Sequence, residues 1–114
     1  MRHEFEISHR EENDWTIVEI HGEADMYTAP QIREHVFDRI RTGHHRLILD
    51  LLGVQFMDST GLGALVGIRN HIAPHGGELR LAISHPGIRR IFAITGLHHV
   101  FPIYDTVDLA KAAP

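Results

Sequence analysis

The sequence contains no cysteine, so disulfide bonds and thiolate metal sites are excluded. It also has no apolar run of the roughly 20 residues that a membrane-spanning helix needs, and residues 1–5 contain no apolar signal core. The net charge of −4 argues against direct binding of DNA, because a phosphate backbone attracts basic surfaces. From these absences we expect a cytoplasmic protein that does not insert into a membrane.

The rest of the composition is ordinary for a globular chain, with 43% hydrophobic and 23% charged residues. Residues 1–114 are expected to form one domain, because this is a common domain length. Histidine is unusually frequent, with eleven copies, and the pairs His44-His45 and His98-His99 fall near predicted helix ends, where the helix dipole favours them. No histidine spacing is typical of zinc ligands, so we predict no metal ion and no other cofactor. A response to pH through histidine stays open.

Hydrophobic periodicity predicts the secondary structure. Polar and apolar residues alternate over 4–9 and 15–20, which indicates an antiparallel hairpin around a charged turn at 10–14. Further strands are expected at 47–52, 78–83 and 100–104. Apolar residues at helical spacing predict helices that begin near Thr28, Asp58, His85 and Asp105, with a capping box from Thr28 to Gln31 and a frayed end over 112–114.

The predicted order is β-β-α-β-α-β-α-β-α. Strands that alternate with helices imply βαβ units with right-handed crossovers, and the opening hairpin makes the sheet mixed. We therefore predict an α/β fold in which a mixed sheet packs with about four helices.

The stretch from Leu47 to Gly67 organises this fold. The apolar run 47–52 is typical of a strand that is covered on both faces, and a short apolar loop is expected over 53–57. The next residues, Asp58-Ser59-Thr60-Gly61, then stand at the start of a helix. Backbone N–H groups at a helix start have no partner and the dipole is positive there, so a phosphate at this position would be well tolerated.

Two questions about this helix stay open: whether the polar residues at its start only cap it, and why it contains interior glycines. Asp58 or Ser59 could simply cap the helix, since such residues are common at N-caps. Gly63 and Gly67, which lie one turn apart, could pack tightly against the protein's own sheet, or they could form a smooth groove where another backbone approaches. Interior glycines each weaken a helix by roughly 1 kcal/mol relative to alanine, so their presence needs one of these reasons.

The run Phe56-Met-Asp-Ser-Thr-Gly-Leu-Gly-Ala-Leu-Val-Gly67 resembles the signature of STAS-domain anti-sigma factor antagonists, and Gly22–Pro30 is similar to the family's second signature. The resemblance covers nearly the whole chain. One departure is Ala24, where the family more often has leucine or valine. The resemblance implies a STAS-like single domain over residues 1–114 of a bacterial regulatory protein.

The resemblance also implies a mechanism. In the family, the serine after the aspartate, here Ser59, is phosphorylated by the anti-sigma factor, a serine kinase with a GHKL-type ATP-binding fold. The unphosphorylated protein would bind this kinase and release a sigma factor, phosphorylation would switch binding off, and a phosphatase would reset Ser59. Thr60 is the weaker candidate acceptor and is expected to hold local backbone groups. The expected partner-binding residues are Glu23, Asp25, Asp58, Ser59, Thr60, Gly61, Gly63 and Gly67.

Parts of the sequence are also compatible with other roles. Glu23 and Asp25 could be solvated loop acids rather than partner contacts. STAS-like domains also serve as subunits of lipid-transport ATPases and as parts of signalling scaffolds. Enzyme classes fit poorly: the spacing of Asp58 and Gly61 differs from the aspartic-protease pattern, Met57 breaks the serine-hydrolase elbow, and no phosphate-binding loop is present. We therefore predict a binding protein that is a kinase substrate and not a catalyst.

Overall fold

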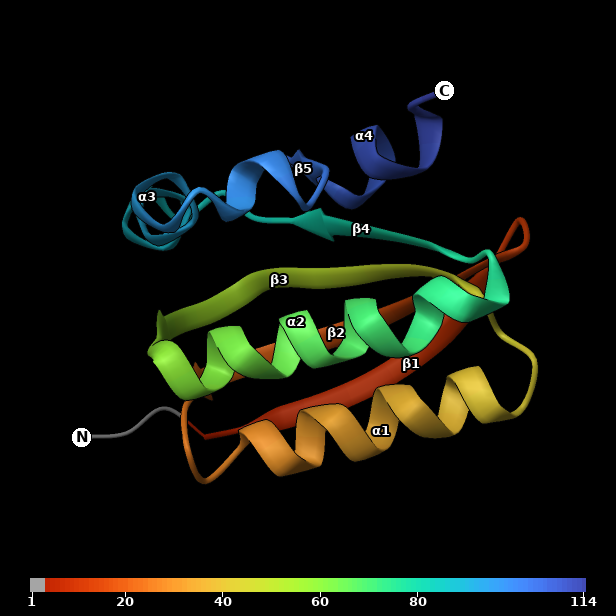
Figure 1. Cartoon of the computed structure of the whole chain (residues 1–114). Coiled ribbons are helices and arrows are strands. Elements are labelled where there is room, and N and C mark those ends of the chain that lie inside the picture. Colours follow the sequence, from red (N-terminus) through yellow and green to blue (C-terminus); the bar gives the residue numbers. More distant parts are fainter. Residues whose placement is uncertain (1–3) are drawn as a thin grey trace.

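The computed structural model describes residues 4–114, so the part of the N-terminal prediction that concerns residues 1–3 lies outside it. Within the described part the predicted element order is confirmed (Figure 1). Two 3-10 turns, η1 (Ala73–His75) and η2 (Leu97–His99), follow α2 and α3. The strands and helices are β1 (Glu6–Glu12), β2 (Trp15–Ala24), α1 (Ala29–Arg41), β3 (Arg46–Met57), α2 (Ser59–Ile72), β4 (Glu78–Ala82), α3 (Pro86–Thr95), β5 (Ile103–Tyr104) and α4 (Val107–Ala112).

The sheet has the strand order β1-β2-β3-β4-β5. Only β1 and β2 pair antiparallel, and every later pair is parallel, so the predicted mixed sheet and the α/β fold class are confirmed. Right-handed crossovers between neighbouring parallel strands place α1 and α2 on the same face of the sheet. Figure 1 shows these two helices side by side below β3, while α4 lies on the other side of β4. No helix in the described range is both long and apolar enough to cross a bilayer.

The opening hairpin is tighter than the sequence predicted. Its strands extend to Glu12 and Trp15, which pair directly, so most of the expected charged turn is strand. The turn itself is Asn13-Asp14, whose φ angles are 50° and 71°. Asparagine and aspartate tolerate this left-handed region, and a two-residue turn with positive φ matches the twist of the flanking strands.

Strand β3 is also longer than predicted. The expected loop at 53–57 is strand, because β2 continues to Ala24 and supplies a partner as far as Met57. The register shifts between Glu19 and His21 and again between Gly22 and Glu23, so β3 holds extra residues as bulges. β4, in contrast, pairs with β3 only up to Asp50. The last strand is shorter than expected, since β5 holds only Ile103 and Tyr104.

Two apolar layers hold the sheet. The larger layer lies between the sheet and helices α1, α2 and α3, and includes Val18, Ile32, Leu65 and Phe92. The smaller layer lies under α4 on the opposite face and consists of Trp15, Ile17, Ile48, Ala82, Val107 and Ala110. Each layer buries apolar surface that a sheet must cover on both faces when its strands are parallel.

The C-terminal residues are held by Arg80. Its guanidinium is 8% exposed and donates hydrogen bonds to the carbonyl oxygens of Ala110 at 2.6 Å and Ala113 at 2.9 Å. It also donates to the carboxylate of Glu78 at 3.0 Å, which balances its charge. The prediction that residues 112–114 fray was therefore wrong, because a buried arginine needs these carbonyls as acceptors.

Candidate partner-binding site

Asp58 connects β3 to α2 and caps the helix. Its backbone is extended, and its carboxylate Oδ1 accepts hydrogen bonds from the N–H groups of Thr60 at 2.9 Å and Gly61 at 3.0 Å. Its carbonyl accepts from the N–H of Leu62, and its own N–H donates to the carbonyl of Ala24 at 3.2 Å. The predicted cap is confirmed, and these bonds fix the start of α2 against the end of β2.

Ser59 and Thr60 occupy the first turn of α2, and both are exposed. Neither hydroxyl makes a hydrogen bond to any residue in the range 4–114. The expectation that the Thr60 hydroxyl holds local backbone groups was therefore wrong, because Asp58 already binds the nearest N–H groups. Both hydroxyls are available to another molecule.

The loop from β2 to α1 is shaped by Asp25. This residue is 7% exposed, and its Oδ1 accepts hydrogen bonds from the N–H groups of Tyr27 at 2.9 Å and Thr28 at 3.1 Å. Thr28 donates its hydroxyl to the carbonyl of Glu23 at 2.6 Å and makes no cap bond to α1. The predicted capping box was wrong: Gln31 instead donates to the carbonyl of Tyr27 at 3.4 Å. Asp25 supports the loop from inside.

The three glycines of α2 have different surroundings. A Cβ added to Gly61 would lie 2.2 Å from the carbonyl oxygen of Ala24, so only glycine allows α2 to approach β2 this closely. A Cβ at Gly63 would meet nothing within 4 Å, and one at Gly67 would meet only the Arg33 side chain at 3.8 Å. Tight packing therefore explains Gly61. At Gly63 and Gly67 the helix has room for a side chain but carries none, so its backbone is accessible there.

Three exposed apolar side chains belong to the segments that end at the same edge of the sheet as Ser59, and the sequence pattern did not single them out. Met26 and Tyr27, in the β2–α1 loop, are 62% and 66% exposed, and Phe56, which pairs with Glu23 at the end of β3, is 48% exposed. We call Met26, Tyr27, Phe56, Ser59, Thr60 and Gly63 the Ser59 rim. The apolar pair Met26-Tyr27 inside a predicted loop was the signal that could have found them. Aromatic and methionine side chains are enriched in protein interfaces.

The electrostatics of the rim disfavour a second anion. Asp58 occupies two of the N–H groups that a helix start would offer to a phosphate, and its charge offsets the positive end of the dipole. The helix start therefore supports a phosphate on Ser59 less than the sequence predicted, because the Asp58 carboxylate already accepts from these N–H groups. In the described part of the chain no group of three or more histidine, aspartate or glutamate residues is arranged to hold a metal ion.

These features define a class of protein: a small α/β domain with an exposed pair of hydroxyls on a capped helix start. The chain belongs to the STAS domain family, whose model matches residues 6–110. The predicted family is thus confirmed over nearly the whole chain.

Several relatives share this family. The anti-sigma F factor antagonist of Paenibacillus polymyxa is 36% identical over 90 residues, which cover 78% of this chain and 77% of the relative. The anti-sigma-B factor antagonist of Bacillus subtilis (strain 168) is 40% identical over 86 residues, covering 75% and 78%. The crystal structure of an anti-sigma factor antagonist from Mycobacterium paratuberculosis superposes with a TM-score of 0.87 at 28% identity, covering 95% and 92%.

Proposed function

We propose that this protein is an anti-sigma factor antagonist of the bacterial cytoplasm, whose binding to its partner is switched off by phosphorylation of Ser59. The observation that carries the proposal is the position of Ser59: an exposed residue on a capped helix start, whose hydroxyl makes no hydrogen bond to residues 4–114, at the sheet edge that also carries three exposed apolar side chains. The names of the relatives, which are antagonists of anti-sigma factors, support the same assignment.

In this proposal the partner is an anti-sigma factor that is also a serine kinase. The unmodified protein binds it through the Ser59 rim, and the anti-sigma factor releases its sigma factor as a result. Met26, Tyr27 and Phe56 supply apolar contact area, and Gly63 lets the partner's backbone come close to α2. Glu23 and Asp58 add polar contacts at the edge of the rim, while Asp25 and Gly61 hold its shape from beneath.

The kinase reaction requires little from this chain. The partner supplies ATP, Mg²⁺ and the residues that orient the γ-phosphate, and the Ser59 oxygen attacks phosphorus as the bond to ADP breaks. The hydroxyl proton passes to a base of the partner. This protein contributes the position of the Ser59 hydroxyl, because Asp58 and Gly61 fix the backbone of Ser59 against β2.

The phosphate then acts by its charge. It adds about −1.5 to −2 charges next to Asp58, in a surface that must lose water when the partner docks. An unpaired charge at such an interface costs about 2–5 kcal/mol, which corresponds to a loss of affinity of roughly 30-fold to several thousand-fold. The fold is not expected to melt, since the phosphate lies on the exposed side of α2. A phosphatase that removes it would restore binding.

The test uses three substitutions and one partner. Ser59→Ala should capture the anti-sigma factor from cell extract constitutively, and Ser59→Asp should lose this binding while keeping the thermal stability of the wild type. Ser8→Asp, which makes the same change at an exposed position on β1, should bind like the wild type. The captured partner, mixed with ATP and the wild-type chain, should label Ser59.

Two results would contradict the proposal. Phosphate found on Thr60, with Ser59 unmodified, would show that Thr60 is the switch residue and that Ser59 is not. Equal affinity of Ser59→Asp and the wild type for the captured anti-sigma factor would show that charge at this position does not control binding.

A further inference from the structure

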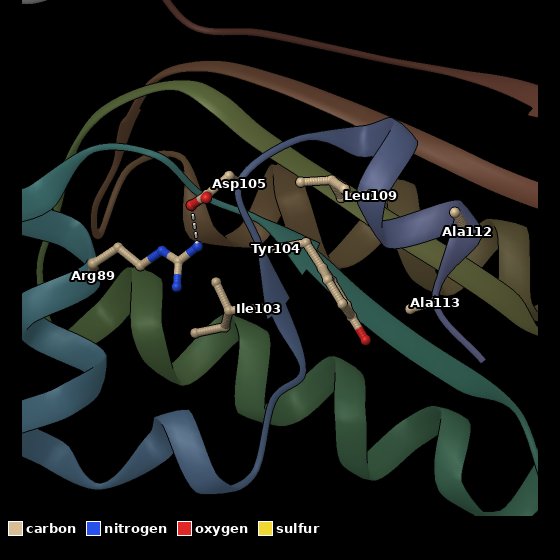
Figure 2. Close-up of a pocket in the computed structure, with 7 residues that line it drawn as sticks. All are labelled: Arg89, Ile103, Tyr104, Asp105, Leu109, Ala112 and Ala113. Atoms are coloured by element: carbon tan, nitrogen blue, oxygen red, sulfur yellow. Dashed lines mark hydrogen bonds and ion pairs between the residues drawn. The ribbon is translucent and has the colours of Figure 1, made fainter.

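A cavity of about 580 Å³ lies at the free edge of β5, between α3 and α4 (Figure 2). It wraps around this edge, because Ile103 packs against the larger apolar layer and Tyr104 against the smaller one, and Leu109 and Ala112 of α4 line one end. Arg89 of α3 stands at the opposite end. The volume is in the range of pockets that hold small molecules. None of these residues belongs to the Ser59 rim, so the cavity is a separate feature.

The apolar part of the cavity is incompletely covered. Leu109 is 53% exposed, although it stands on a helix whose buried face is fixed under the sheet by Val107 and Ala110. Leu109 therefore does not serve the core of the protein. Its side chain, with Ile103 and Ala112, forms an apolar surface that a ligand's hydrocarbon part would cover favourably.

The polar end of the cavity offers hydrogen-bond donors that an anion can use. The Arg89 guanidinium is held in place by two hydrogen bonds, from Nε to the carbonyl of Ile83 at 2.8 Å and from Nη2 to Asp105 Oδ1 at 2.7 Å. Its third nitrogen, Nη1, and the Tyr104 hydroxyl make no hydrogen bond within residues 4–114. Figure 2 shows the guanidinium beside Ile103, at the end of the cavity away from Ala112. Unused N–H donors on a fixed arginine are suited to a carboxylate.

We propose that this cavity binds a small amphiphilic carboxylate, whose head group accepts hydrogen bonds from Arg89 Nη1 and whose apolar part covers Ile103, Leu109 and Ala112. A cation would find only Asp105, which is already paired with Arg89. A neutral hydrocarbon would cover Leu109 but would add no acceptor for the guanidinium, which is partly exposed and would keep its hydrogen bonds to water. Asp105 weakens the attraction for an anion, so the affinity for a ligand of about ten heavy atoms should be roughly millimolar or tighter.

The experiment is a titration of the full chain, labelled with ¹⁵N, with sodium octanoate and separately with 1-octanol. Octanoate should shift the amide signals of residues 103–105 and 109–113, and octanol should shift them much less. Arg89→Gln should weaken octanoate binding by about tenfold or more, since a charge-assisted hydrogen bond is lost. Arg90→Gln, which removes the same charge from an exposed neighbour, should change binding by less than about twofold. Asp105→Asn should tighten binding.

Arg89→Gln could disturb the fold, because Arg89 Nε also donates a hydrogen bond to the carbonyl of Ile83. A second pair of variants therefore tests the cavity without changing Arg89. Leu109→Asp should abolish octanoate binding, whereas Ile94→Asp, at a side chain that is 74% exposed on α3, should leave it unchanged. The proposal is overturned if octanol and octanoate act alike, if Arg89→Gln and Arg90→Gln weaken binding equally, or if the shifts are centred outside the cavity. Phosphorylation and capture of the anti-sigma factor do not enter this readout.

Discussion

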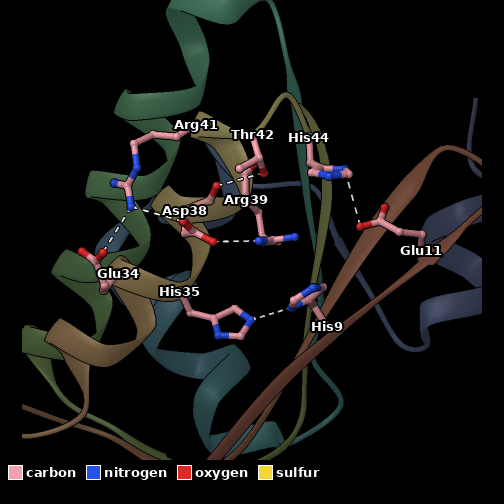
Figure 3. A network of polar contacts seen from close by, with 9 residues as sticks. All are labelled: His9, Glu11, Glu34, His35, Asp38, Arg39, Arg41, Thr42 and His44. Carbon is pink, nitrogen blue, oxygen red and sulfur yellow. Dashed lines mark hydrogen bonds and ion pairs between the residues drawn. The ribbon is translucent and has the colours of Figure 1, made fainter.

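The Ser59 rim and the surface where α1 meets β1 use their side chains in contrasting ways. Around α1 the polar groups pair with one another: Arg41 contacts Glu34 and Asp38, and His9 on β1 contacts His35 on α1 at 2.9 Å (Figure 3). At the rim, apolar side chains are exposed and two hydroxyls have no partner in the described chain. A surface whose polar groups are satisfied within the chain gains little from a partner, which is why the proposed function assigns partner contact to the rim.

The largest expected effect separates the buried side of α2 from its exposed side. Gly61→Ala should destabilise the protein by about 3 kcal/mol, because its Cβ would overlap the backbone of Ala24, which cannot move cheaply. Gly63→Ala should instead stabilise the fold by up to about 1 kcal/mol, because alanine favours the helix and meets no neighbour. Chemical denaturation measures both. Equal effects would mean that the two sides of α2 do not differ as described.

The next effect concerns partner affinity. Phe56→Ala should weaken binding to the anti-sigma factor by about 10–100-fold, as expected for an aromatic anchor, with little change in stability because Phe56 is half exposed. Arg41→Gln on the paired side should leave binding within about twofold of the wild type, because its contacts are internal. Surface plasmon resonance with immobilised anti-sigma factor would compare them. If Arg41→Gln weakens binding as much as Phe56→Ala, the contrast between the two surfaces fails.

The smallest expected effect is a pH response of the surface where α1 meets β1. Burial, and then the nearby charges of His9 and Arg39, lower the pKa of His35 below 6.5, although Asp38 opposes them. Protonation of His35 therefore favours the unfolded chain, and the stability contribution is complete above pH 6.5 and is lost as the pH falls below that value. The melting temperature should drop by less than about 4 °C over this range. Thermal melts of His35→Gln should lack this drop.

His21 provides a control, because its pKa is shifted in the opposite direction to that of His35. Its hydrogen bond to Glu19 raises its pKa above 6.5, so its contribution is complete below pH 6.5 and is lost as the pH rises through the folded-state pKa. His21→Gln should therefore alter the melting profile on the alkaline side, and His35→Gln on the acidic side. Both variants changing the profile on the same side would refute the assignment of these shifts.

Much of the site could be predicted from sequence because its signals are local. The Asp58 cap depends on bonds to residues two and three positions ahead, and helix α2 follows from the spacing of its apolar residues. The exposure of Met26, Tyr27 and Phe56 was not predicted, because an apolar residue gives no indication of which side of a loop or strand end it occupies. The role of Asp25 was missed for a related reason: its carboxylate holds the N–H groups of loop residues that precede α1, whereas the sequence pattern indicated a cap formed by Thr28.

The amino-acid sequence by itself determined the order of strands and helices, the mixed sheet and the placement of Ser59 at a helix start, because these depend on periodicity and on bonds between close neighbours in the chain. The tertiary structure decided the lengths of β2 and β3, the need for glycine at position 61 and the anchoring of the C-terminal residues by Arg80. Each of these depends on an atom contributed by a distant segment, and a one-dimensional pattern carries no information about the distance between such segments.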